Sequence, residues 1–142
     1  MNNLPDELYR VHAILKEYVS IHDRIFKPSL RKNIRIPGIF KPIDFGRHFD
    51  DLGVLVNELE EVTISADLGD KQPVFIEYVT ALLRTIEELR VLCGKLSAKS
   101  EGAAYSMEEY KSDVAAYQDL VSEYRAIGSK LNLKLSLFNI RR

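Results

Sequence analysis

The stretch PVFIEYVTALLRTIEELRVLCGKL, Pro73 to Leu96, decides the fold of this chain. Its apolar residues recur at alternating spacings of four and three, which is typical of the inner face of a helix packed against other helices. These positions are Phe75, Val79, Leu82, Ile86, Leu89, Cys93 and Leu96. Arg84, Thr85 and Glu88 are among the polar residues at the other positions. The stretch therefore predicts a core helix of a bundle, with one face buried and one face in water.

The same spacing predicts three further helices. The first runs from about Leu4 to Ile25, and the second starts between Asp44 and His48 and ends near Ala66. Lys95 to Tyr105 reads as a polar turn, after which Ser106 begins the fourth helix and Glu109 completes a capping box. A short connection makes the second and third helices antiparallel neighbours. We expect a single all-α domain over residues 1–142, an up-down four-helix bundle.

Two segments outside these helices favour extended structure. The first connection, Lys27 to Gly46, is long and rich in proline, and Asn33 to Ile36 within it alternates polar and apolar residues. Leu131 to Ile140 also alternates, although its leucines continue the helical spacing as well. We favour a strand here, because a helical tail would be apolar on every face and would include Gly128 and Asn132, which are poor helix formers. A strand needs a backbone partner, so we expect these two segments to pair.

The composition of the chain indicates the cellular environment of the protein. The chain has 142 residues, a net charge of −1 and a single cysteine, Cys93. A lone cysteine cannot form a disulfide within the chain, which favours a reducing, intracellular environment. The first residues do not resemble a signal peptide, and no stretch approaches the roughly 20 apolar residues of a membrane span. We expect a soluble, cytoplasmic protein.

Residues that could carry catalysis each have a simpler interpretation. Glu58 and Glu61 have the spacing of a magnesium-binding pair, but they fall outside the core face of their helix. Cys93 lies on the apolar face between Leu89 and Leu96 and reads as a small hydrophobic residue. His22 points inward, without a second metal donor one turn away. The sequence therefore predicts no catalytic residue, no metal site and no cofactor.

Charge is distributed unevenly along the chain. Residues 24–41 and 125–142 carry basic residues without acids, whereas residues 48–70 carry acids without Lys or Arg. The simpler interpretation is internal complementarity between basic and acidic segments. The functional interpretation is a basic surface for nucleic acid or an acidic protein, and an acidic helix for a basic partner. If the two extended segments pair, their charges form one basic patch of Arg31, Lys32, Arg35, Lys134 and Arg141.

Tyrosines form one stripe along the fourth predicted helix. Tyr110, Tyr117 and Tyr124 lie seven residues apart and so share a face. Such a stripe is either a core edge or an interface, because tyrosine brings a large contact area with few rotatable bonds. Our leading hypothesis is a non-enzymatic protein-interaction module, an adaptor, regulator, immunity-type or assembly protein, that binds a protein partner or a second copy. The alternatives are a nucleic-acid-binding protein that uses the basic segments, and a small helical enzyme.

Overall fold

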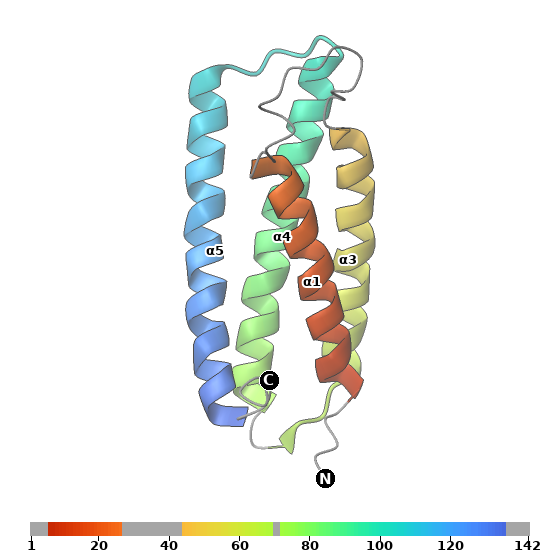
Figure 1. Cartoon of the computed structure of the whole chain (residues 1–142), viewed down its shortest axis with the longest axis vertical. Helices are drawn as coiled ribbons and strands as arrows, with labels where there is room; N and C mark the ends of the chain where they lie inside the picture. The colour runs from red at the N-terminus through yellow and green to blue at the C-terminus, as the bar shows by residue number, and fades with distance from the viewer. Residues whose placement is uncertain (1–5, 27–43, 70–71, 136–142) are drawn as a thin grey trace, which may run out of the picture.

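Four helices form an up-down bundle (Figure 1). The computed structural model describes residues 6–26, 44–69 and 72–135, with side chains up to residue 130. Within these ranges helices are joined by short connections, and there is no strand. The helices, labelled as in Figure 1, are α1 (Asp6–Phe26), α3 (Phe45–Ser65), α4 (Gln72–Ser100) and α5 (Met107–Leu135). The predicted helices and their antiparallel order are thereby confirmed, whereas the proposed strand at residues 33–36 lies outside the described residues.

α4 is the central helix. It packs along α3 on one side and along α5 on the other, and it also touches α1. All of its predicted inner positions from Phe75 to Cys93 are buried. Thr85, which we expected on the wet face, is 0 % exposed, and its hydroxyl lies 2.8 Å from the Ala81 carbonyl oxygen and 3.2 Å from that of Leu120 in α5. Because α4 has neighbours on several sides, it buries more than one face.

The end of α4 differs from the prediction. The helix runs through the segment from Lys95 that we expected to be a turn and stops after Ser100. It stops where Gly102 adopts a φ of 109°, a conformation that glycine tolerates. The amides of Gly102 and Ala103 then donate to the carbonyls of Lys99 and Ala98, both at 3.0 Å, which is the Schellman arrangement. The polar turn is therefore confined to residues 101–106.

The start of α5 is as predicted. The backbone amide of Glu109 donates to the Ser106 hydroxyl at 3.0 Å, and the Ser106 amide donates to the Glu109 carboxylate at 2.8 Å. These two bonds form the capping box. They satisfy donors that the first turn of a helix leaves without partners.

The predicted strand at the end of the chain is wrong for residues 131–135. α5 continues through Gly128 to Leu135. Alternating leucines are compatible with a helix and with a strand. Each residue added to an existing helix, however, gains a hydrogen bond without a new nucleation cost. A strand would instead need a second strand to pair with. Residues 136–142 lie outside the described part of the chain.

Candidate functional site

The tyrosine stripe of α5 is mostly core. Tyr117 is 0 % exposed and Tyr124 is 4 % exposed, and only Tyr110 keeps a partly exposed face. The Tyr124 ring lies 6.0 Å from that of Tyr18 in α1 and 6.3 Å from that of Tyr78 in α4, measured between centroids. α1 and α4 therefore cover most of the stripe within this one chain.

A polar cluster joins α1 to α5. The hydroxyls of Tyr18 and Tyr117 form a hydrogen bond, and His22 Nδ1 lies 2.7 Å from the Tyr117 oxygen. Phe26 stacks on the Tyr117 ring, with 5.6 Å between centroids. Burial raises the pKa of both Tyr18 and Tyr117, so both phenols stay protonated at neutral pH. His22 is the satisfied inward histidine that the sequence predicted.

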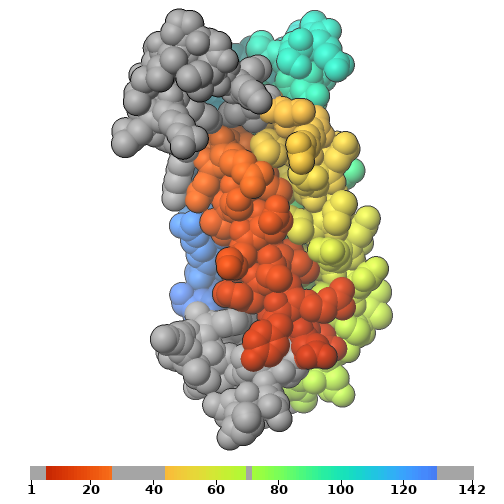
Figure 2. Space-filling view, turned by 45° about the vertical axis from the view of Figure 1, so that its right-hand side comes forward, coloured from red at the N-terminus to blue at the C-terminus, as the bar shows by residue number. Residues whose placement is uncertain are grey.

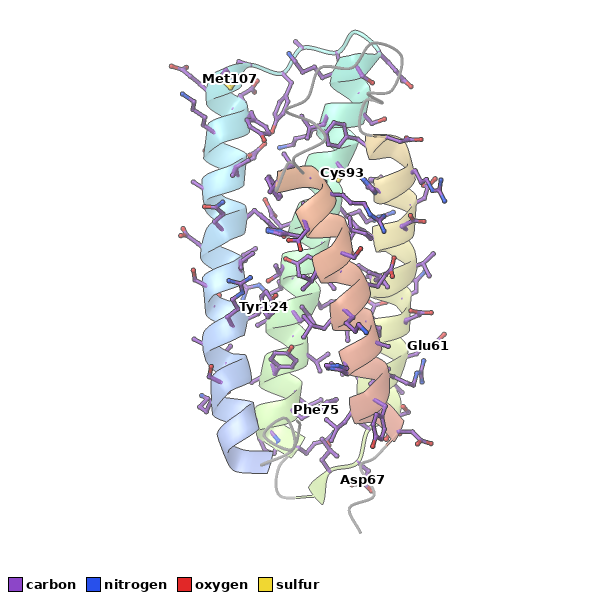
Figure 3. The ribbon with its side chains drawn as sticks, in the orientation of Figure 1. Glu61, Asp67, Phe75, Cys93, Met107 and Tyr124 are labelled. Carbon is purple, nitrogen blue, oxygen red and sulfur yellow. The ribbon has the colours of Figure 1, made fainter. Side chains whose placement is uncertain are left out.

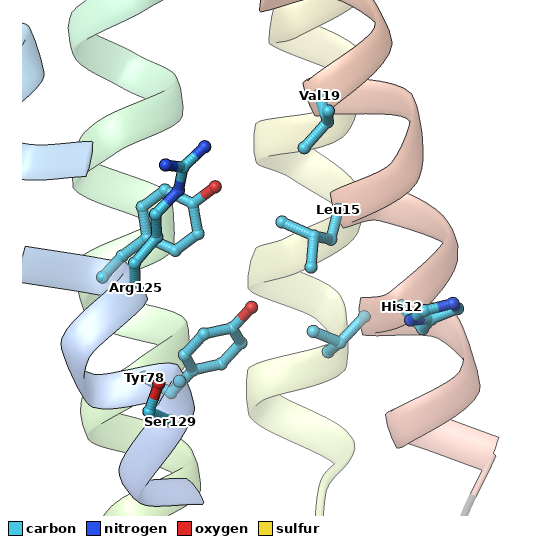
Figure 4. Close-up of a pocket in the computed structure, with 9 residues that line it drawn as sticks. His12, Leu15, Val19, Tyr78, Arg125 and Ser129 are labelled. Carbon is cyan, nitrogen blue, oxygen red and sulfur yellow. The ribbon is translucent and has the colours of Figure 1, made fainter. Parts of the chain in front are cut away.

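Beside this cluster, α1 and α5 are separated by a groove of about 510 Å³. Figure 4 shows Leu15 and Val19 of α1 on one side, and Tyr78 of α4 with Arg125 of α5 on the other. Most of the lining is apolar. The sequence analysis missed this groove, because it depends on how far apart two helices lie that are not neighbours in the sequence.

The outer face of α3 carries a row of exposed residues. Their spacing of four and three places them on one face of the helix, opposite the buried one. This outer row consists of Asp50, Val54, Asn57, Glu61 and Ile64. Val54 is 54 % exposed and Ile64 is 86 % exposed, although both are large aliphatic residues. Figure 2 shows α3, in yellow and yellow-green, at the surface beside α1.

Acidic side chains surround this outer row. Glu58 and Glu60 are exposed next to it, and neither they nor Asp50 form an ion pair within the described residues. Glu61 lies 3.4 Å from Arg10 of α1, and Figure 3 shows it on the outer side of α3. Glu58 and Glu61 thus belong to a solvated acidic face, as expected from their positions.

Two further predictions from the sequence concern the basic patch and Cys93. Arg31, Lys32, Arg35 and Arg141, and the side chain of Lys134, lie outside the described part of the structure, so the basic patch stays a prediction. Cys93 is buried, and burial raises the pKa of its thiol to about 12, so the thiol is neutral and shielded at physiological pH.

Among the described side chains, no group of three or more His, Cys, Asp or Glu is placed to hold a metal ion. No helix in the described ranges combines the length and the apolar character needed to cross a bilayer.

Comparison with known proteins gives no relative. No family model matches the chain, and neither a curated protein nor a solved structure does. Function must therefore be inferred from this chain's own residues.

Proposed function

We propose that the chain is a non-enzymatic protein-interaction module that binds a basic partner protein through the outer row of α3. The observation that carries this proposal is the pair of exposed aliphatic residues, Val54 and Ile64, set among acids on one helical face. A single exposed aliphatic side chain is ordinary on a protein surface. Two on one face form an amphipathic contact surface with Asp50, Glu58 and Glu60, which make no ion pair in the described part of the chain.

The chemistry of this face defines its partner. Apolar contacts with Val54 and Ile64 would supply affinity, while Asp50, Glu58 and Glu60 would attract Lys and Arg and fix the register. An amphipathic helix with a row of aliphatic residues flanked by basic ones matches both features. We therefore propose a basic amphipathic segment of another protein as the occupant.

The test compares two double variants of the tagged full chain in the cells it comes from. Ile64→Ser with Glu60→Lys alters the outer row, whereas Met107→Ser with Glu108→Lys makes the same chemical changes at the start of α5. Met107 is also an exposed apolar residue, at 66 %. Circular dichroism first establishes that both variants keep their helices. Bound proteins are then identified by mass spectrometry, and the basic segment of each is synthesised for direct binding to the purified chain.

We expect the α3 variant to lose a partner that the α5 variant retains. The basic segment of that partner should bind the unmodified chain, with an affinity that falls as the salt concentration rises. The proposal is overturned if every bound protein survives the α3 changes. It is also overturned if the lost component is a nucleic acid, or a second copy of the chain detected by sedimentation.

A further inference from the structure

The hydroxyl of Tyr78 faces the groove between α1 and α5, although the rest of this side chain is buried. Tyr78 is only 6 % exposed, and its ring points into the space between the two helices (Figure 4). In the described part of the chain, its hydroxyl forms no hydrogen bond. Burial raises the pKa of Tyr78, so the hydroxyl keeps its proton and can donate it to an acceptor. Because the hydroxyl opens onto the groove, its acceptor can be water or a bound ligand.

Arg125 of α5, an exposed cation, lines the same groove. Arg125 forms no salt bridge with any residue that the structure describes, whereas Arg84, Lys95 and Lys130 along the α4–α5 seam each pair with an acid. Ser129 adds a second hydroxyl to the lining. Arg125 and the hydroxyls of Tyr78 and Ser129 together suit an anion, and His12 of α1 is a further polar residue of the lining.

The rest of the groove is apolar. Val11, Leu15 and Val19 of α1 form one wall, and Gly128 of α5 lies on the other side. A methyl group at Gly128 would come within 3.0 Å of Tyr78 Cε1, so the glycine lets α5 approach the Tyr78 ring. The volume of about 510 Å³ falls within the range of about 300–1,000 Å³ typical of small-molecule sites.

From these groups we propose that the α1–α5 groove binds an amphipathic carboxylate with an aliphatic chain. The chain would lie along Val11, Leu15 and Val19, and the carboxylate would accept from Arg125 and the Tyr78 hydroxyl. A single guanidinium balances the single charge of a carboxylate and can bind it through two parallel hydrogen bonds.

The test uses octanoate as the probe, with octanol, octyltrimethylammonium and acetate as comparisons. Binding to the full chain is followed by two-dimensional amide NMR, in which the glycine region resolves Gly128 beside the groove. We expect octanoate to shift Gly128 and its neighbours in a saturable manner. Octanol should bind at least about tenfold more weakly, because it lacks the charge-assisted bonds. Acetate lacks the apolar chain and octyltrimethylammonium has the wrong charge, so neither should saturate.

Variants separate the two polar contacts. Arg125→Gln should weaken octanoate binding by about tenfold, and Tyr78→Phe, which keeps the ring, by about threefold. Arg84→Gln removes a cation that pairs with Glu123 at 3.7 Å, outside the groove lining, and should leave the affinity unchanged. Equal affinity for octanol and octanoate would overturn the proposal. So would shifts confined to other regions, no saturable binding, or unchanged affinity in Arg125→Gln.

Discussion

At the scale of single residues, Gly128 has a role opposite to the one its type suggests. Glycine within a sequence that reads as a helix often marks its end. Here Gly128 lies inside α5, and its missing side chain makes room for the Tyr78 ring of α4. The local helical cost of glycine is offset by this close packing.

Gly128→Ala should therefore destabilise the protein. Alanine in an open helix interior would stabilise it by up to about 1 kcal/mol, but the new methyl group would meet Tyr78 at 3.0 Å. We expect a net loss of about 1–3 kcal/mol in the free energy of unfolding, measured by urea denaturation. Gly46→Ala is the control, because its nearest contact, Ser97 Oγ at 3.4 Å, is ordinary. A rise in stability in Gly128→Ala would contradict this account of the packing.

Cys93 should be unreactive in the folded protein. The thiol is buried and its pKa is raised to about 12, so almost no thiolate forms at pH 8. A chromogenic thiol reagent should label the chain only after guanidinium chloride is added, and Cys93→Ala should remove the signal completely. Rapid labelling of the native protein would place Cys93 at the surface and restore it as a candidate nucleophile.

At the scale of the elements, end motifs fix where helices start and stop. The Schellman arrangement around Gly102 ends α4, and the capping box of Ser106 and Glu109 starts α5 only a few residues later. Lys95, on the last turns of α4, also reaches Asp113 of α5 at 3.0 Å. Backbone and side-chain hydrogen bonds therefore fix the turn both where α4 ends and where α5 begins.

Ser106→Ala should shorten α5 at its start and cost about 1 kcal/mol, because the Glu109 amide loses its acceptor. Urea denaturation followed by circular dichroism measures the loss. Ser112→Ala tests the specificity of the effect, since Ser112 is an exposed residue within the same helix, and its change should stay within about 0.5 kcal/mol. Equal effects of the two substitutions would show that the capping box adds nothing to stability.

At the scale of the whole molecule, tyrosines fill much of the seam between α1 and the α4–α5 pair. Tyr18, Tyr78 and Tyr117 all lie in the core, and burial raises the pKa of each. Their folded forms therefore hold protons more tightly than the unfolded chain, whose phenols have a pKa of 10.0. The stability that these groups contribute is fully present below about pH 10 and is lost as the pH rises above it.

Alkaline pH should consequently unfold the bundle. We expect the tyrosinate absorbance of the buried residues to appear together with the loss of helical circular dichroism. Tyr78→Phe removes one buried phenol without breaking any hydrogen bond among the described residues, so stability should fall less steeply with pH in this variant. Ionisation of all seven tyrosines with the helices intact would contradict the burial of this cluster.

The sequence by itself determined the features that depend on local order. The four-three spacing from Phe75 to Cys93 predicted the core helix, because burial on one side of a helix imposes that period. The capping box at Ser106 was readable because its two bonds join residues three positions apart. The acidic face of α3 followed from the same spacing.

Only the tertiary structure decided features that depend on neighbours distant in the sequence. Thr85 is buried because both α3 and α5 pack against α4, and no local pattern shows how many sides of a helix are covered. Gly128 lies inside α5, and Tyr78, fifty residues earlier, occupies the space beside it, which no local pattern shows. The groove that Arg125 lines is the space that the side chains of α1 and α5 leave open beside the contact between Tyr18 and Tyr117. Such distances depend on the packing of all the helices together, which a periodic pattern does not encode.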